Sequence, residues 1–582
     1  MTTNYGWKRR ILRIDLSTTA VQTFVPDDSV LTAYLGGRGL GAKFVYDAGR
    51  VDALAPENRL VFAAGPLTGT RTPASGRVSL STKSPLTGTI FDSNCGGTFG
   101  PELKKAGYDA IIITGTSSEP VYIEIEDDYV DLKPAAALWG RNVKETAKLL
   151  KDKGSTACIG RAGEQQVLLA SIMADTVHTF GRGGVGAVMG SKRLKAITVK
   201  GTGRVEISDE REFERQKQSI NWLIIASPTI TRGLSVFGTP FLLKITSWMK
   251  ILPVANFQQA EPSVNVSPFF GKSIAERCTP RKRACYSCPI ACKREDPAGG
   301  ELPEYETIGM MSANLRNEDY DAIVKANRLC NDYGMDTISV GATLGCYAEL
   351  RGAGIAGAEL VALTEQIGER AGIGARLGFG AKRFAESLGH PEAAMQVKGL
   401  ELPAYDPRGV KGLGFSYATS NRGGCHTRAY LVAPEILRKP KAIDPYTLAG
   451  KAGHTKIFQD RFAAVDSLVV CKFAFFGPGE EEYANILSAV TGVTFSSEDL
   501  MRVGERIWNL ERLYNLREGF SNEDDTLPER FFTVPANGRI IDHAEFLRTR
   551  TEYYRMRGWD DYGVPTARTL KRLGLDELEP SS

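Results

Sequence analysis

Residues 75–115 read SGRVSLSTKSPLTGTIFDSNCGGTFGPELKKAGYDAIIITG and contain two short runs that are typical of β-strands. The runs GRVSLSTK (76–83) and AIIITG (110–115) are rich in β-branched residues and are bounded by Gly, Pro or Asp. The same pattern recurs on both sides, in ILRIDL (11–16), RLVFAAG (59–65), VYIEIE (121–126) and AITVKG (196–201). A helical segment, NVKETAKLLKDKG (142–154), interrupts the series, with Gly154 as its expected end. Residues 1–205 therefore predict a β-rich domain with helices packed on it.

The rest of the chain has the three-and-four apolar spacing of amphipathic helices. This spacing occurs at 210–224, 318–334, 358–372 and 498–519. A second boundary is expected near residue 400, where ELPAYDPRGVKGLG is rich in Pro and Gly. The predicted fold class is α+β, with the β-rich domain followed by two mainly helical domains at 206–400 and 401–582.

Composition excludes several functions. The chain has 582 residues, 42% of them hydrophobic and 24% charged, with a net charge of +4, which gives no reason to expect nucleic-acid binding. The N-terminus has no apolar export signal, so we expect a cytoplasmic protein. The most apolar stretch, Trp222–Phe257, is interrupted by Arg, Lys, Gly and Pro, so a membrane span is not expected. Two interpretations remain for this stretch: a pair of buried helices, or the lining of a substrate channel.

Three of the ten cysteines are clustered in KRACYSCPIACKRE, with the spacing Cys285-x2-Cys288-x3-Cys292. Three thiolates this close can occupy three corners of an iron–sulfur cubane, and the fourth ligand then comes from elsewhere in the chain. A zinc site is less favoured, because no second CxxC or HxxxH is present. Spacing alone leaves two candidates for the fourth ligand, Cys471 in an apolar context and Cys425 in NRGGCHTRAY.

A series of long motifs resembles the aldehyde ferredoxin oxidoreductase family of tungsten enzymes, in one order and over nearly the whole chain. The motifs are YLGGRGLGAKFVYD (34–47), the stretch 75–115, GRGGVGAVMGSKRLKAITVKG (181–201), CYSCPIAC (285–292), PEYETIG (303–309), NDYGMDTISVG (331–341), RGGCHTR (422–428), ERIWNLERLYNLREGF (505–520) and YYRMRGWDDYGVPT (553–566). The resemblance implies two pyranopterins that hold one tungsten (or molybdenum) beside one [4Fe–4S] cluster. It also implies a Mg²⁺ ion that bridges the pterin phosphates.

The resemblance assigns roles to several residues. In this family the fourth cluster ligand ends a D-x-x-G-L-C motif, which here reads Asp466-Ser-Leu-Val-Val-Cys471, with Val469 in the place of Gly. A carboxylate suits the N–H edge of a pterin, so Asp466 is expected to bind one pterin. The second motif reads Asn331-Asp-Tyr-Gly334-Met-Asp336 and is expected to bind the other pterin. The alternative role of Asp336 is that of a helix N-cap.

Three further residues of the first domain are implied as cofactor contacts. Arg77 matches an arginine between cluster and pterin, where a cation would stabilise the reduced cluster; the alternative for Arg77 is a surface salt bridge. Asn94 and the neighbourhood of Gly184 match the backbone carbonyls that bind the Mg²⁺ ion.

For proton chemistry the resemblance implies His426 in RGGCHTR and a glutamate of PEYET. Glu306 is preferred as the catalytic glutamate, and Glu304 is the alternative. The expected reaction oxidises an aldehyde to a carboxylic acid, with electrons passed to ferredoxin or to a separate iron–sulfur subunit. Two alternatives remain: ring reduction of the benzoyl-coenzyme A type on the same scaffold, and a non-catalytic iron–sulfur carrier. A homodimer or larger complex is possible, without an iron between the subunits.

Overall fold

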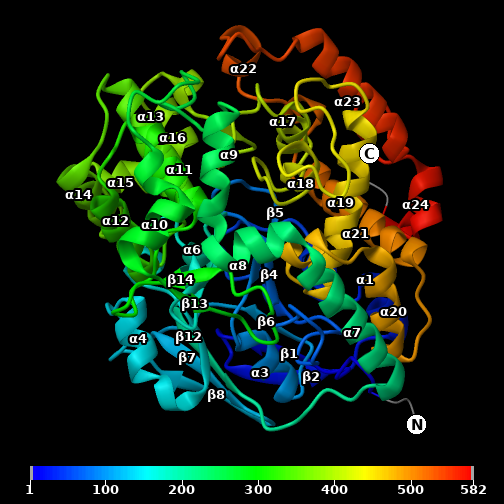
Figure 1. The fold of residues 1–582 in the computed structure, drawn as a ribbon. Coiled ribbons are helices and arrows are strands. Elements are labelled where there is room, and N and C mark those ends of the chain that lie inside the picture. Colours follow the sequence, from blue (N-terminus) through cyan, green and yellow to red (C-terminus); the bar gives the residue numbers. More distant parts are fainter. Residues whose placement is uncertain (1–3, 579–582) are drawn as a thin grey trace.

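The computed structural model describes residues 4–578 and has two β-sheets at its base, below the helices of the rest of the chain (Figure 1). The first sheet has, in spatial order, β2 (Ala20–Phe24), β1 (Ile11–Asp15), β6 (Ala110–Thr114), β3 (Leu60–Ala63), β4 (Val78–Lys83) and β5 (Ile90–Cys95). The second has β11 (His178–Phe180), β10 (Ile172–Ala174), β9 (Ser155–Cys158), β12 (Leu194–Lys200), β7 (Val121–Glu126) and β8 (Tyr129–Pro134). All six strand runs predicted from the sequence are strands of these sheets.

Most neighbouring strands are antiparallel, and each sheet has one parallel pair, β1 with β6 and β7 with β12. The two sheets meet where β5 packs against β11. Six helices accompany them: α1 (Asp28–Tyr34), α2 (Gly37–Tyr46), α3 (Phe99–Lys105), α4 (Val143–Leu149), α5 (Arg161–Glu164) and α6 (Val185–Ser191). Helix α2 packs on β3, β4 and β5 of the first sheet. The end of β5 is therefore enclosed on several sides, and it supplies residues to the site described below.

The chain between β12 and β15 (Gln396–Val397) is mainly helical. Its helices are α7 (Glu210–Ala226), the π-helix η2 (Thr229–Leu234), α8 (Ser235–Phe237), α9 (Leu242–Trp248), α10 (Gly271–Cys278), α11 (Tyr305–Met311), α12 (Tyr320–Tyr333), α13 (Thr337–Leu350), α14 (Gly357–Gly368), α15 (Gly374–Leu377) and α16 (Ala381–Glu386). A hairpin of β13 (Arg281–Arg283) and β14 (Lys293–Glu295) brackets the clustered cysteines, and β15 pairs with β16 (Leu400–Glu401). The helices α7, α12, α14 and α21 (Ser497–Arg517) confirm the four helical segments predicted from spacing.

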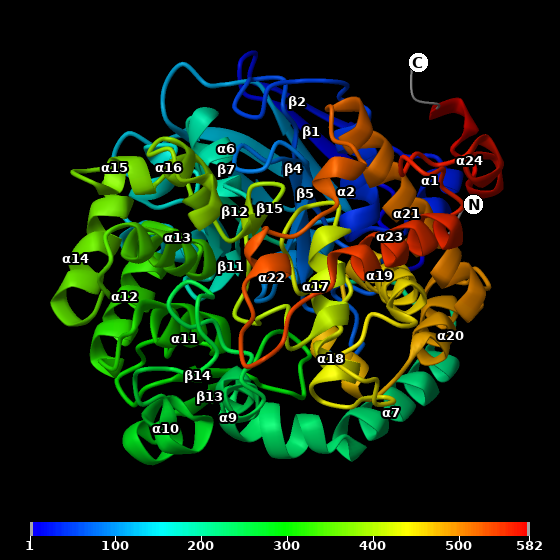
Figure 2. The same ribbon diagram turned by 90° about the horizontal axis from the view of Figure 1, so that it is seen from above.

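Seen from above, the C-terminal helices lie opposite α10 to α16, while α7 runs alongside α20 (Glu480–Thr491) (Figure 2). The C-terminal helices are α17 (Lys411–Ala418), α18 (Val432–Glu435), α19 (Lys451–Leu468), α20, α21, α22 (Arg530–Thr533), α23 (His543–Arg557) and α24 (Ala567–Leu573). Helix α19 packs against α2, α21 and α23. Its close approach to α2 requires glycine, because a Cβ on Gly37 (φ +40°) would lie 2.3 Å from the carbonyl oxygen of Asp466.

The predicted burial of the apolar stretch Trp222–Phe257 is wrong at several positions. Trp222, Ile225, Val236 and Trp248 are 69%, 64%, 43% and 80% exposed. Leu242, in contrast, lines the largest cavity described below, as the channel interpretation predicts. None of the helices among residues 4–578 is both long and apolar enough to span a bilayer.

Candidate active site and cluster site

Two adjoining cavities lie where the sheets meet the helical regions. The main cavity has a volume of about 250 Å³, and the cysteine cavity has a volume of about 220 Å³. Both are lined by Arg77, Thr179, Glu304, Cys471 and Phe473, which therefore form the wall between them. A third, smaller cavity of about 90 Å³, the side cavity, adjoins both at Thr179 and Glu304.

The cysteine cavity is lined by Cys285, Cys288, Cys292 and Cys471, while Cys425 lies in a different place. Within residues 4–578, no three His, Cys, Asp or Glu side chains converge closely enough to hold a single metal ion. The four thiols instead surround a space, and this donor set fits a cubane, whose iron atoms each take one cysteine. Burial is the main cause that raises the pKa of Cys288 to about 11, and the neighbouring Cys471 adds to it. Iron would therefore displace a proton from Cys288 on binding.

Local structure explains how Cys471 reaches this cavity. Helix α19 ends at Leu468 and is capped by Val469, which has φ +63° and ψ +40°. Cys471 follows in extended conformation as the N-cap of the 3₁₀-helix η7 (Lys472–Phe476). The backbone N–H of Cys471 donates to the carbonyl of Ala74 at 3.0 Å. A left-handed conformation is uncommon for a β-branched residue and favours glycine. The substitution of Val for Gly in this motif therefore keeps the turn, at a cost in backbone strain.

The other motif copy is built in the same way. Helix α12 ends at Gly334, which has φ +71°, and Asp336 caps α13 by accepting from the N–H of Ser339 at 2.9 Å. Asp336 thus has the structural role considered as its alternative, and its carboxylate also lies 3.5 Å from Arg182 Nε. Asn331 and Asp336 line the side cavity rather than the main cavity. Gly184 and Gly334 line none of the three cavities; Gly184 is the left-handed N-cap of α6.

Arg77 is half-buried, and it lines both the main cavity and the cysteine cavity. Its guanidinium donates to the side-chain oxygen of Asn94 and, at 2.7 Å, to the backbone carbonyl of Asn94. Burial alone would lower the pKa of Arg77, but the thiols of Cys471 and Cys285 outweigh this and leave it raised. Within residues 4–578, Arg77 forms no salt bridge, so the surface salt-bridge alternative is not what the structure shows.

The sequence reasoning missed a buried ionic network around the main cavity. Arg38 forms a bidentate pair with Glu511 at 2.7 Å and lies 3.4 Å from Asp92 and 3.6 Å from Asp466. Arg428 pairs with Asp92 and lies 3.5 Å from Asp466. Of this network, the sequence analysis singled out only Asp466, as a pterin contact. The other members lie within motifs of the resemblance, but a charged residue alone gives no sign in the sequence of the partner it meets in the fold.

Several buried donors and acceptors around this cavity have no hydrogen-bond partner among the described residues. The donors are Arg38 Nη1, Arg182 Nε, Arg422 Nε, Arg428 Nε and Asn94 Nδ2, and the acceptors are Asp92 Oδ2 and Asp466 Oδ2. Leaving such a group unpaired costs about 1–3 kcal/mol. Phosphates and pterin edges offer the complementary acceptors and donors, so the residues present fit a pterin cofactor.

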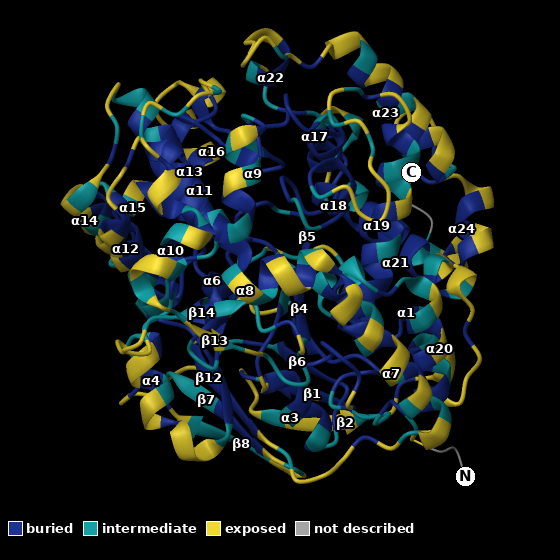
Figure 3. Cartoon of the chain, in the orientation of Figure 1, coloured by how far each residue is buried: buried dark blue, intermediate teal, exposed yellow. Residues whose placement is uncertain are grey.

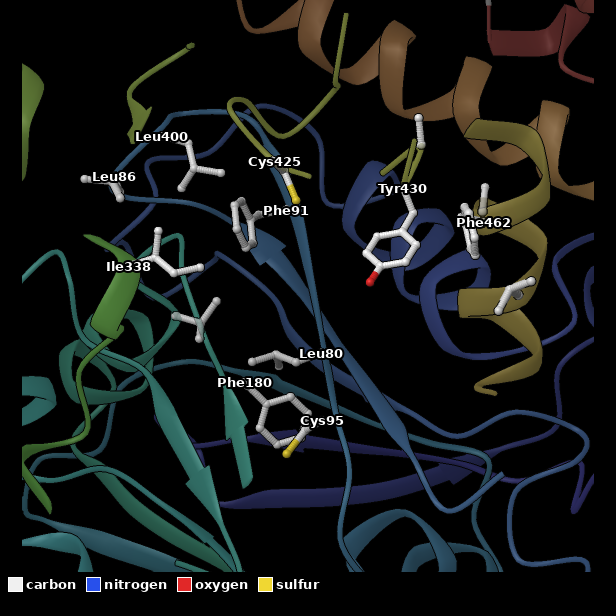
Figure 4. Packing of buried hydrophobic residues seen from close by; sticks show 14 of the residues in the cluster. Leu80, Leu86, Phe91, Cys95, Phe180, Ile338, Leu400, Cys425, Tyr430 and Phe462 are labelled. Carbon is white, nitrogen blue, oxygen red and sulfur yellow. The ribbon is translucent and has the colours of Figure 1, made fainter. Parts of the chain in front are cut away.

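Cys425 belongs to the same basic surroundings. Its sulfur accepts from Arg422 Nη2 at 2.9 Å. Burial by itself would raise the pKa of Cys425, yet Arg422, Arg428 and Arg182 together lower it to about 6. Figure 4 shows Cys425 beside Phe91, and Cys425 is not among the residues that line the cysteine cavity.

Glu306 and His426 come together at the wall of the main cavity. Glu306 Oε2 accepts from the N–H of Ala404 at 2.8 Å, and Glu306 Oε1 lies 3.4 Å from His426 Nε2. Burial raises the pKa of Glu306 to about 8. Burial lowers the pKa of His426 well below its usual value, and the positive charges of Arg182 and Arg422 lower it further. The imidazole is therefore neutral.

Glu304 lies elsewhere, although it is only two residues from Glu306. It precedes α11 in extended conformation and pairs with Lys293 at 3.0 Å. Its side chain remains 47% accessible because it faces all three cavities. Lys293 lowers the pKa of Glu304 and outweighs burial, which alone would raise it. An ionised glutamate paired with lysine is less suited to accept a proton than Glu306.

Aromatic side chains line one part of the main cavity, and they were not predicted. Tyr430 has a positive φ of 46°, and its ring centroid lies 6.2 Å from that of His426 and 6.3 Å from that of Phe473. Figure 4 shows its hydroxyl pointing away from Phe462. Such strain is typical of functional sites. Together with Tyr405, these rings give the main cavity an apolar face beside the Glu306–His426 pair.

Two family models together match most of the chain. The family model for the N-terminal domain of aldehyde ferredoxin oxidoreductase matches residues 11–201, and that for its domains 2 and 3 matches residues 216–575. The chain therefore belongs to the aldehyde ferredoxin oxidoreductase family, and it is an oxidoreductase of that family.

Individual relatives match over their whole length. The chain is 42% identical to a tungsten-containing aldehyde ferredoxin oxidoreductase of Pyrococcus furiosus and 41% identical to one of Thermococcus kodakarensis, over 99% of this chain and 100% of each relative. Among solved structures, an active-site complex of benzoyl coenzyme A reductase with 1,5-dienoyl-CoA superimposes with a TM-score of 0.86. It is 24% identical and covers 99% of this chain and 98% of that one, which shows a shared fold.

Proposed function

We propose that this chain oxidises aldehydes to carboxylic acids at a tungsten bis-pyranopterin centre and passes the electrons through one [4Fe–4S] cluster to ferredoxin. The observation that carries the proposal is the position of the Glu306–His426 pair on a cavity that shares a wall with four converging cysteines. The named relatives, at about 40% identity over the full chain, support the same reaction.

The bound tungsten–pterin centre would supply the two-electron oxidation, and the chain's own residues would bind the substrate and move the proton. His426 would donate a hydrogen bond to the aldehyde oxygen. It would do so as a neutral imidazole, because burial lowers its pKa. Glu306 Oε1 has no hydrogen-bond partner among the described residues, so it is free to accept a proton. Tyr430 and Phe473 would exclude water and hold the apolar part of the substrate.

The remaining predicted contacts are part of this proposal. Asp466 and the Asn331–Asp336 motif would hold the two pterins, and Arg77 would lie between cluster and pterin. Backbone oxygens near Asn94 and Gly184 would bind the bridging Mg²⁺. We also propose the division into 1–205, 206–400 and 401–582, and the break between the two family models, from 201 to 216, supports its first boundary.

Neither alternative function has an observation of equal weight. A ring reductase of the benzoyl-coenzyme A type is supported by likeness of fold alone. A non-catalytic iron–sulfur carrier would have no use for the unpaired donors around the main cavity or for a buried Glu–His pair.

The proposal is tested by metal analysis of the anoxically purified protein together with aldehyde-dependent reduction of a viologen dye. We expect tungsten or molybdenum at about one atom per chain and iron at about four, the content of one cubane, and dye reduction that requires the aldehyde. Protein that contains iron but neither tungsten nor molybdenum would favour the carrier.

The pH dependence of aldehyde oxidation follows from Glu306. Because burial raises its pKa to about 8, the carboxyl is neutral below this pH and can accept a proton only above it. We therefore expect kcat/KM to rise with pH up to about 8 and then to level off. A glutamate with an ordinary pKa of about 4.3 would give a flat profile over the same range. A steady-state profile from pH 5.5 to 9.5 distinguishes the two, and a flat profile would remove Glu306 as the base.

A further inference from the structure

An exposed apolar surface lies on the outside of the cysteine loop. Trp222 and Ile225, at 69% and 64% exposure, are three residues apart and so share one face of α7. Val236 of α8 is 43% exposed, and Figure 3 shows the exposed residues of α7 and α8 on the same side of the molecule. Large exposed apolar side chains that gather on one surface are typical of interaction sites. We refer to Trp222, Ile225 and Val236 as the apolar surface.

The apolar surface is attached directly to the segments that carry the four cysteines. Ser235 Oγ donates to the carbonyl of Ile290 at 2.7 Å. A Cβ on Gly238 would lie 2.7 Å from the carbonyl oxygen of Cys292. On the other side, a Cβ on Gly477, just after η7, would lie 2.6 Å from the carbonyl oxygen of Leu223. The backbone that carries the apolar surface therefore contacts both segments that bear the cysteines.

The same region is strongly basic, although the whole chain has a net charge of only +4. Residues 228–294 contain ten Lys or Arg and two Asp or Glu, so they alone contribute +8. Four of these basic residues are exposed and form no ion pair with the rest of the described chain: Arg232, Lys244, Arg281 and Lys282. Their elements pack together, because α8 contacts both η2 and α10, and β13 follows α10 in the chain.

We propose that an acidic iron–sulfur electron carrier docks on this surface, with its apolar contact on Trp222 and Ile225 and its carboxylates facing Arg232, Arg281 and Lys282. The proposal rests on the proposed function, because the carrier takes the electrons released by aldehyde oxidation. Each aldehyde that is oxidised with one water to a carboxylic acid releases two protons and reduces two carriers by one electron each. A basic rim increases the encounter rate with an acidic partner, and small interfaces are typical of transient electron transfer.

The test compares two electron acceptors in the intact, metal-loaded enzyme. One acceptor is an acidic ferredoxin; the other is a zwitterionic viologen, which carries no net charge. The variants are the double charge reversal Arg232→Glu/Lys282→Glu and, separately, Trp222→Ser. The matched control is Lys382→Glu, an exposed, unpaired lysine at the start of α16.

We expect the double reversal to lower kcat/KM for ferredoxin about tenfold or more at low ionic strength, with a smaller effect at high salt. Trp222→Ser should lower it severalfold at any salt concentration. Reduction of the viologen should stay within about twofold in all variants, and Lys382→Glu should match the wild type with both acceptors.

Three outcomes would overturn the docking proposal. The first is that ferredoxin reduction is unchanged in both variants. The second is that ferredoxin reduction falls only in parallel with viologen reduction. The third is that light scattering shows Trp222→Ser to dissociate a dimer, which would mean that a second copy of the chain covers the surface. Failure of the proposed function is distinguishable, because wild-type enzyme would then reduce neither acceptor with an aldehyde.

Discussion

Replacement of Glu306 by Gln is expected to lower aldehyde-dependent viologen reduction at least about a hundredfold, the lower end of what a general base contributes. The amide keeps the shape of the side chain, and its oxygen can still accept from the N–H of Ala404, a contact of 2.8 Å in the wild type. It cannot accept the proton that Glu306 Oε1 is positioned to take. Because the wild-type carboxyl is already neutral below a pH of about 8, the change adds no buried charge. Tungsten and iron contents and the melting temperature should remain those of the wild type.

Glu304→Gln is the matched control, because it makes the same chemical change two residues away. This substitution removes the partner of Lys293, so we expect a lower melting temperature or a lower iron content. Activity normalised to bound tungsten should remain within about tenfold of the wild type. The opposite result, with Glu304→Gln inactive and Glu306→Gln active at full metal content, would exchange the two roles.

This pair of glutamates shows where prediction from sequence ends. The two glutamates of PEYET lie 12 and 14 residues beyond Cys292, a difference too small to assign their roles from spacing. Glu304 precedes α11 in extended conformation, while Glu306 lies in its first turn, so the two side chains diverge. One meets Lys293, eleven residues away, and the other meets His426, 120 residues away. Only the folded chain brings such distant residues together.

The strands and long helices were predictable because their signals are local. A run such as AIIITG specifies β6 by its own composition, and the apolar spacing of 498–519 specifies α21. Buried ion pairs have no comparable signal. Arg38, Asp92 and Glu511 are separated by tens to hundreds of residues, and each alone is indistinguishable from a surface charge in the sequence. Trp222 and Ile225 show the opposite error. Their apolar side chains predicted burial, but the structure places them at the surface.

The altered motif around Cys471 was the least secure part of the predicted cluster site, and the structure explains why a substitution is tolerated there. The turn depends on one residue with positive φ, and Val469 adopts that conformation while its side chain is fully buried. Buried packing offsets part of the strain. The position of the cysteine relative to α19 is thus set by the turn and by the hydrogen bond to Ala74, and glycine is not required.

Cys471→Ala is accordingly expected to remove the fourth corner of the cluster without unfolding the turn, because the backbone N–H that donates to Ala74 is retained. Iron should fall from about four atoms per chain to three or fewer. The EPR signal of the reduced four-iron cluster should disappear, and dye reduction should fall at least tenfold. Cys425→Ser is the control: it keeps an acceptor for Arg422 and should retain all the iron, because Cys425 lies outside the cysteine cavity. Full iron in Cys471→Ala together with iron loss in Cys425→Ser would instead make Cys425 the fourth ligand.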